Sequence, residues 1–154
     1  MKQVSVIGCG RWGTFLAWYV ANYCRTDGVL LYGIEGAPSY EELKSTRKNE
    51  YLTLSDNMLL TTDMAETLKN DFIIISISCQ NLRSLAKQIN GYKVEGKTFL
   101  LAMKGLEEPS AKILAEVFKE EIKQNGRTVL SSTDGFSMPM FFNNLCGKNF
   151  SGEK

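Results

Sequence analysis

The residues best suited to chemistry stand near the start of the chain, where three glycines follow a short apolar run. Gly8, Gly10 and Gly13 have the spacing G-x-G-x-x-G, between a strand-like run over 1–7 and a helical pattern over 14–24. The first glycine permits a tight turn, the second lets the backbone approach a pyrophosphate, and the third allows close packing of helix on sheet. The N–H groups that begin such a helix favour phosphate ligands. The pattern predicts a dinucleotide site, and the alternative is a structural turn without a ligand.

Three other residues, Cys9, Arg11 and Trp12, lie inside this glycine loop and are expected at the cofactor. For Arg11 and Trp12, the backbone N–H groups matter more to a pyrophosphate than the side chains. The bulky Trp12 side chain is expected to pack against neighbouring loops. Arg11 either reaches a phosphate or is an ordinary solvated arginine.

An acidic residue, Glu35, ends the second apolar run, about 20 residues after the last glycine, as in dinucleotide-binding sheets. A carboxylate at this place accepts hydrogen bonds from the adenosine ribose hydroxyls and repels a 2′-phosphate. No arginine follows it until Arg47, which agrees with a preference for NAD over NADP. The alternative is a solvated loop glutamate beside Gly36.

Two later segments follow apolar runs and are therefore expected at the carboxyl edge of the sheet. Lys104 follows the fifth run, where a cation could polarise a substrate carbonyl or bind a substrate phosphate. The alternative is a surface lysine at a turn. Ile77 ends the fourth run and Ser78 follows it; both are expected to line the nicotinamide side, with helix capping as the simpler role for Ser78.

The composition excludes several kinds of function. The 154 residues have a net charge of +1, which indicates neither a nucleic-acid partner nor a membrane-surface partner. The absence of histidine excludes any histidine-based catalytic triad or general base. The four cysteines lack metal-ligand spacing, so no metal is expected. We expect reduced thiols in a cytoplasmic protein. No apolar run reaches the length of a membrane span, and no signal peptide is expected.

The elements that must position these residues alternate along the chain. Strands are expected over 1–7, 29–34, 58–61, 72–77, 98–103 and 128–131. Helical patterns fall between them: over 14–24, in a short helix within 37–48, in one capped by Asp63, in one closed by Gly91, and in one running from Pro109 to Asn125-Gly126. This alternation predicts a single α/β domain, a doubly wound Rossmann fold with a mostly parallel sheet, over residues 1–131. Residues 132–154 have no clear period and are expected to form an extra helix or a link to a missing domain.

The sequence around the glycine loop resembles a known family. G-C-G-R-W-G-T-F-L-A, at 8–17, is similar to the cofactor loop G-x-G-x-W-G-T-x-[LV]-A of NAD-dependent glycerol-3-phosphate dehydrogenases. Further similar segments follow in the family's order, at 31–35, 49–52 (one residue short), 72–82 and 102–107. The resemblance extends over about residues 2–131.

The resemblance implies NAD as cofactor and hydride transfer between NAD(H) and glycerol 3-phosphate or dihydroxyacetone phosphate in a complete enzyme. Lys104 corresponds to a family lysine at the substrate site. The chain departs from the family at Ser78, where the family has proline, and from residue 132 on. The family's all-helical substrate domain has no counterpart, so this chain alone is expected to be inactive.

Two other kinds of function are compatible with the same sequence. One is a stand-alone, non-catalytic NAD(H)-binding or redox-sensing module, which a turnover assay would distinguish from an enzyme. The other is an interaction domain that has lost the cofactor and presents Phe141 and Phe142 to a partner, which an NADH titration would distinguish from both. A homodimer is a further expectation, because the missing domain would leave apolar surface exposed.

Overall fold

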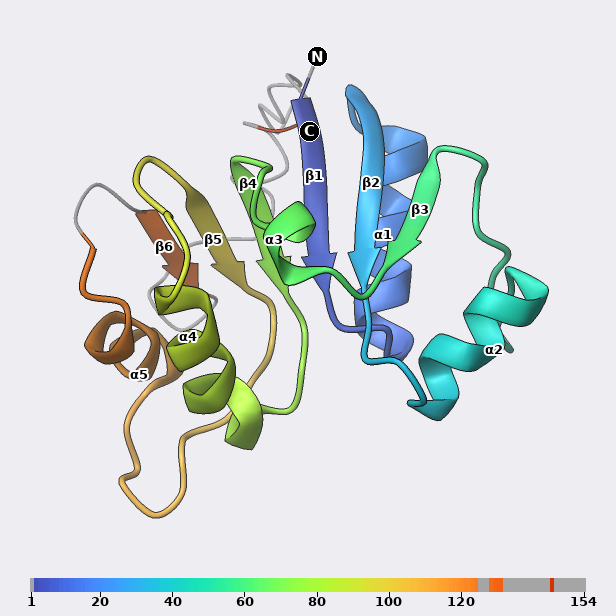
Figure 1. Ribbon diagram of the computed structural model, residues 1–154. Helices are drawn as coiled ribbons and strands as arrows, with labels where there is room; N and C mark the ends of the chain where they lie inside the picture. Colours follow the sequence, from blue (N-terminus) through green and yellow to red (C-terminus); the bar gives the residue numbers. More distant parts are fainter. Residues whose placement is uncertain (1, 125–127, 132–144, 146–154) are drawn as a thin grey trace, which may run out of the picture.

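The computed structural model describes residues 2–124, 128–131 and 145, and their strands form one parallel sheet of six strands (Figure 1). The strand order is β3-β2-β1-β4-β5-β6, and every neighbouring pair is parallel. This is the order of the doubly wound Rossmann fold, as predicted. The strands are β1 (Lys2–Ile7), β2 (Thr26–Tyr32), β3 (Met58–Thr61), β4 (Phe72–Ile75), β5 (Thr98–Leu101) and β6 (Thr128–Ser131).

Helices cover both faces of the sheet. The α-helices are α1 (Arg11–Tyr23), α2 (Pro38–Thr46), α3 (Met64–Thr67), α4 (Leu82–Asn90) and α5 (Leu114–Glu121), with a 3-10 turn η1 (Cys79–Asn81) before α4. Helix α1 packs on one face of the sheet, and α3, α4 and α5 pack on the other. The uninterrupted apolar run of β4 reflects this arrangement, because Ile74 packs on the α1 side while Ile73 and Ile75 pack on the α4 side.

The point where the chain reverses its winding lies between β1 and β4. From β1 the strand order runs outward to β2 and β3, and from β4 it runs outward to β5 and β6. A hydrogen bond of 2.8 Å from the Ser76 N–H to the Ile7 carbonyl oxygen joins the two strands at their carboxyl ends. Ligands of such sheets bind in the crevice outside this point. The glycine loop leaves the sheet here, at the lower edge in Figure 1.

The predicted element types agree with the structure, but several boundaries were wrong. Strands β2 and β4 end at Tyr32 and Ile75 rather than at residues 34 and 77, and α1 begins at Arg11 rather than at residue 14. Strand β2 begins at Thr26, because pairing with β1 continues through the Asp27-Gly28 step that reads as a turn. Strand β5 ends at Leu101 rather than residue 103. Helix α5 begins at Leu114, since Ala111 adopts a left-handed conformation (φ 55°) that interrupts a helix, and Pro109 therefore precedes the helix instead of lying in its first turn.

The cysteine expectation also needs correction. Cys24 is disulfide-bonded, whereas Cys9 and Cys79 are free. Spacing along a sequence cannot show which thiols the fold brings together. Within the described part of the chain, no helix is long and apolar enough to cross a membrane. The tail over 132–154 lies outside the described residues except for Leu145, which is buried on the α1 side, so the domain boundary at 131 stays a prediction.

Candidate functional site

Two of the three loop glycines are required by the fold itself. Gly8 has φ +119°, and a Cβ atom there would lie 2.0 Å from the Ser76 carbonyl oxygen. A Cβ atom on Gly13 would lie 2.1 Å from the Gly8 carbonyl oxygen. Real Cβ atoms do not approach so closely, so these glycines allow β1, β4 and α1 to meet at one point.

The third glycine is different. Around an ideal Cβ on Gly10, no atom of the described residues beyond its chain neighbours lies within 4 Å. Its backbone is extended (φ −69°, ψ 178°), a conformation open to any residue. The protein therefore has no internal need for glycine at this position, and the missing side chain leaves space that faces outward from the loop.

The N-terminus of α1 opens on the same space. The hydrogen bond of 2.9 Å from the Thr14 N–H to the Gly10 carbonyl oxygen begins the helix, so the N–H groups of Arg11, Trp12 and Gly13 precede it. The first turn contains no acidic residue, and Gly10 has no side chain that could cap it. The partial positive charge of this helix end is thus left for an external anion.

Cys9 lines the site, but its thiol is unreactive. Its Sγ donates to the Tyr32 carbonyl oxygen at 3.4 Å, and burial raises the pKa of the thiol to about 12. A thiol with this pKa stays protonated at neutral pH and is a poor nucleophile. Its role is to pack beneath the loop, where its Sγ would lie 2.7 Å from a Cβ on Gly33.

The side chains of Trp12 and Arg11 point to neighbouring loops. The half-exposed Trp12 donates its indole N–H to the Ala102 carbonyl oxygen at 3.1 Å, which confirms that it packs against another loop. Arg11 extends over the Tyr51 ring, 5.2 Å from its centroid, and lies 3.9 Å from a Glu50 carboxylate oxygen. The Arg11 guanidinium therefore contacts Tyr51 and Glu50. No local sequence pattern predicts these two contacts.

A pocket of about 490 Å³ lies at the carboxyl ends of β1 and β2. It is bounded by the glycine loop, by the segment after β2 and by one face of α4. The lining residues are Ile7, Gly8, Cys9, Tyr32, Gly33, Ile34, Ala37, Ser39, Ile77, Asn81, Ser84, Leu85 and Gln88. A second hollow of about 370 Å³ continues past Cys9 and Ser39 to the start of α1 and to Asn49 and Tyr51. Together they follow the edge of the sheet across the glycine loop.

Four polar pocket residues were not predicted: Ser39, Asn81, Ser84 and Gln88. The last three lie at helical spacing on one side of η1 and α4. A polar stripe at such spacing reads as a solvated helix face, so the sequence alone gave no signal that it borders a pocket.

Of the residues predicted at the carboxyl edge of the sheet after β2 and β4, only some line the pocket. Ile77 lines the 490 Å³ pocket, whereas Ser78 is exposed, and no capping hydrogen bond from its side chain exists among the described residues. The capping role for Ser78 is therefore wrong. Glu35 is exposed and lies between Ile34, which lines the pocket, and Gly36.

Lys104 is exposed three residues beyond the end of β5. It stands between Ala102, which accepts the Trp12 hydrogen bond, and Gly105. Gly105 has φ +119°, and a Cβ there would lie 3.0 Å from the Cys79 Sγ. The segments after β1, β4 and β5 thus meet around Lys104.

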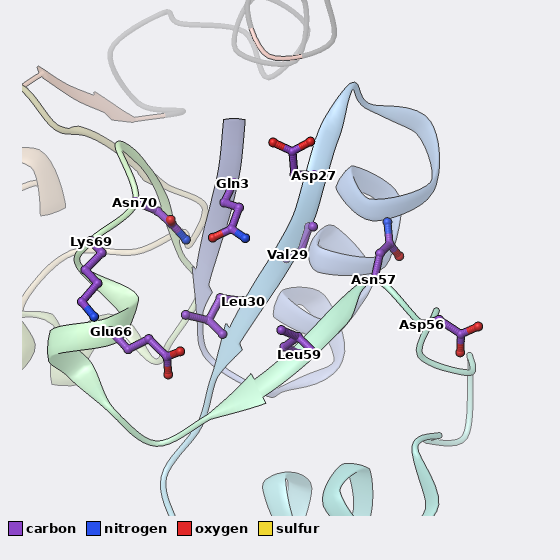
Figure 2. Close-up of a pocket in the computed structure, with 11 residues that line it drawn as sticks. Gln3, Asp27, Val29, Leu30, Asp56, Asn57, Leu59, Glu66, Lys69 and Asn70 are labelled. Carbon is purple, nitrogen blue, oxygen red and sulfur yellow. The ribbon is translucent and has the colours of Figure 1, made fainter. Parts of the chain in front are cut away.

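A further hollow of about 270 Å³ lies elsewhere, among β1, β2, β3 and α3 (Figure 2). Its charged residues are Asp27, Asp56, Glu66 and Lys69. Three carboxylates against one amine disfavour a pyrophosphate, and the only helix among the described residues that contributes to this hollow is the four-residue α3. Among the described residues, no group of cysteines and carboxylates is placed to hold a metal ion.

Comparison with known proteins agrees with this geometry. The family described as NAD-dependent glycerol-3-phosphate dehydrogenase N-terminus matches residues 3–134, and a domain of unknown function matches residues 119–154. The glycerol-3-phosphate dehydrogenase (NAD(P)+) of Bacillus velezensis is 30% identical over 132 residues, which are 82% of this chain and 37% of that protein. That of Agathobacter rectalis is 31% identical over 129 residues, 79% of this chain and 37% of that protein.

Solved structures show the same fold. Glycerol-3-phosphate dehydrogenase from Coxiella burnetii superposes with a TM-score of 0.69 at 20% identity, over 80% of this chain and 38% of that one. An NDP-N-acetyl-D-galactosaminuronic acid dehydrogenase from Methanosarcina mazei gives 0.66 at 14% identity, over 85% of this chain and 34% of that one. The chain spans about 40% of the length of the curated relatives it matches. It belongs to the NAD-dependent glycerol-3-phosphate dehydrogenase family and corresponds to the N-terminal domain of that family.

Proposed function

We propose that this chain binds NAD(H) at the glycine loop and forms the cofactor half of a glycerol-3-phosphate dehydrogenase-like oxidoreductase. The observation that carries the proposal is the open space at Gly10. Gly8 and Gly13 are explained by contacts inside the protein, but Gly10 is not. A pyrophosphate that approaches the backbone there would account for the missing side chain.

The residues around the loop fit a dinucleotide. The N–H groups of Arg11, Trp12 and Gly13 would donate to phosphate oxygens, because the helix begins without a capping side chain. The adenosine end would occupy the 490 Å³ pocket, whose volume is in the range of small-molecule sites. Cys9 and Ile77 would contribute apolar walls to it, so Ile77 would lie at the adenosine end and not on the nicotinamide side that the sequence suggested.

We propose NAD rather than NADP as the preferred cofactor. Glu35 is exposed beside the pocket residue Ile34, where its carboxylate would meet a ribose. A carboxylate accepts hydrogen bonds from the 2′- and 3′-hydroxyls and repels a 2′-phosphate. The names of the curated relatives, with NAD(P)+, do not distinguish NAD from NADP. The preference for NAD is therefore proposed for this chain from Glu35 alone.

At the other end, Lys104 would face the substrate. NAD, when bound, supplies the acceptor for the hydride that leaves C2 of glycerol 3-phosphate. The Lys104 ammonium would stabilise negative charge on the substrate oxygen or its phosphate. A single lysine cannot fix the orientation of a substrate, so turnover requires groups beyond those of this chain. The homodimer and the cytoplasmic location stay predictions.

A size series at Gly10 tests cofactor binding. NADH is titrated calorimetrically into wild type, Gly10→Ala and Gly10→Val, and each variant is melted in parallel. Because the protein leaves the Cβ position open, both variants should melt within about 3 °C of wild type, as a change of about 1 kcal/mol would give. NADH affinity should fall with side-chain size. No binding by wild type at millimolar NADH, or wild-type affinity in Gly10→Val, would refute the proposal.

A further inference from the structure

The residues that follow β5 are held in place by side chains from other elements. We call residues 102–113, between β5 and α5, the Lys104 loop. Before Lys104, Ala102 accepts the Trp12 indole hydrogen bond at 3.1 Å. After it, the Gln80 side-chain amide donates to the Leu106 carbonyl oxygen at 3.1 Å and accepts from the Glu108 N–H at 3.0 Å. Lys104 is therefore fixed on both sides over a short span.

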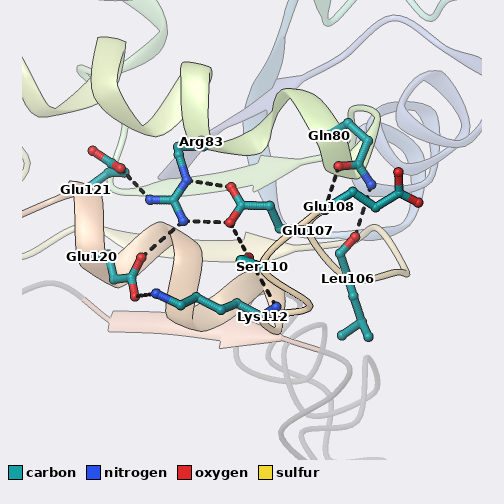
Figure 3. Close-up of polar contacts among 9 residues, drawn as sticks. All are labelled: Gln80, Arg83, Leu106, Glu107, Glu108, Ser110, Lys112, Glu120 and Glu121. Atoms are coloured by element: carbon teal, nitrogen blue, oxygen red, sulfur yellow. Dashed lines mark hydrogen bonds and ion pairs between the residues drawn. The ribbon is translucent and has the colours of Figure 1, made fainter.

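The strongest of these contacts comes from Arg83 on α4 (Figure 3). Its Nε and Nη2 donate to the two carboxylate oxygens of Glu107 at 2.5 and 2.7 Å. Such two-point pairing fixes the angle as well as the distance between the groups. The Ser110 hydroxyl donates to the same carboxylate at 2.6 Å. The Glu107 side chain is only 12% exposed, so solvent screens this pair less than an ordinary surface pair.

Arg83 also binds α5, which provides a comparison within the same cluster. Its Nη1 donates to Glu121 at 2.5 Å, and its Nη2 contacts Glu120 at 3.1 Å. Lys112 pairs with Glu120 on the outer side. Glu107 and Glu121 are thus two shielded carboxylates on one guanidinium, but only Glu107 belongs to the Lys104 loop.

We infer that Arg83 is a positioning residue that acts through Glu107 to hold Lys104 against the nicotinamide end of the cofactor. The inference rests on the proposed function. The Arg83–Glu107 pair fixes the loop on the α4 side, while Trp12 fixes it on the side of the glycine loop. The conformation of Gly105 turns the backbone between these anchors. Loss of the Glu107 contact should move Lys104 away from the cofactor, whereas loss of the Glu121 contact should not.

The test compares Glu107→Gln with Glu121→Gln, which remove the same charge from the same arginine. The reaction of Lys104 with an amine-acetylating reagent is followed by peptide mass spectrometry, with and without NADH at ten times the measured Kd. Bound NADH should slow Lys104 acetylation about tenfold in wild type and Glu121→Gln, because about a tenth of the protein is then free. In Glu107→Gln the protection should fall to about twofold or less.

Arg83→Lys is the second variant, because it keeps the positive charge among the three glutamates but cannot pair at two points. It should behave as Glu107→Gln does. Full protection in Glu107→Gln, or equal loss in Glu121→Gln, would overturn the role of Arg83. If NADH binds but leaves Lys104 of the wild type unprotected, the positioning inference fails while NAD binding stands. If titration detects no NADH binding, the proposed function fails, and the inference with it.

Discussion

The sharpest stability prediction compares Gly8 with Gly10, two glycines of one loop whose surroundings are opposite. Replacing Gly8 by alanine would place a Cβ atom 2.0 Å from the Ser76 carbonyl oxygen, in a backbone conformation of φ +119°. Replacing Gly10 by alanine would place a Cβ atom in open space, with an ordinary backbone. The chemical change is identical, so the difference between the variants reports the geometry.

The expected magnitudes follow from these contacts. A non-glycine residue in a strained conformation costs about 1–3 kcal/mol. Forcing a methyl group against backbone adds roughly 1–3 kcal/mol, since the end of β4 must shift. Gly8→Ala should therefore lose about 2–6 kcal/mol of unfolding free energy. For Gly10→Ala, the poorer helix cap costs at most about 1 kcal/mol, and the reduced freedom of the unfolded chain returns about 0.4–1 kcal/mol.

Equilibrium unfolding in urea measures both values, with far-UV circular dichroism as the signal. The midpoint of Gly8→Ala should fall well below that of wild type at an unchanged slope, and the midpoint of Gly10→Ala should stay close to it. Wild-type stability in Gly8→Ala would refute the close approach of β1 and β4. Equal destabilisation by both substitutions would show that the fold itself needs glycine at position 10, so that no ligand is needed to explain it.

Three further predictions concern cofactor choice, acid stability and turnover. Glu35→Ser should reduce the preference for NADH over NADPH by about 1–3 kcal/mol, measured by paired titrations, and equal preference before and after would contradict the role of Glu35. Hydrogen bonds from Arg83 and then Ser110 lower the pKa of Glu107 from 4.5 to about 2, so its stabilisation is full above about pH 4.5 and disappears as the pH falls toward 2. The difference in melting temperature between wild type and Glu107→Gln should shrink over that interval, and a constant difference would be the adverse result. The isolated chain should oxidise NADH with dihydroxyacetone phosphate far more slowly than about 10 per second, a typical enzyme rate, and a rate near that value would show that a complete substrate site is present.

Local signals in the sequence were sufficient for much of the fold. Strand β3 has the predicted bounds because a short apolar run is enclosed by polar turns. Asp63 caps α3 as predicted, with its carboxylate accepting from the Ala65 and Glu66 N–H groups at 2.8 and 3.2 Å. Both features depend on residues within a few positions of one another, which is what a pattern can report.

The site was predicted only where its residues lie within a few positions of one another in the sequence. The glycine spacing indicated the turn at the end of β1, and the apolar context indicated the strand before it. No sequence pattern indicates contacts between distant segments. Arg83 and Glu107 are 24 residues apart, and Gln80 and Glu108 are 28 residues apart. They meet because parallel pairing brings the ends of β4 and β5 to one edge. The Arg11 side chain likewise meets a distant segment, since Tyr51 lies in the connection between α2 and β3.

Mapping where NADH binds tests the glycine-loop site most directly. Backbone amide signals of the isotopically labelled chain are followed by NMR while NADH is added. Saturable shifts should be centred on the amides of Gly8, Gly10 and Gly13 and should extend to Gly33 and Ile34 at the end of β2. Shifts centred instead on the hollow beside β3 and α3, or no shifts at millimolar NADH, would contradict the claim that the glycine loop is a dinucleotide site.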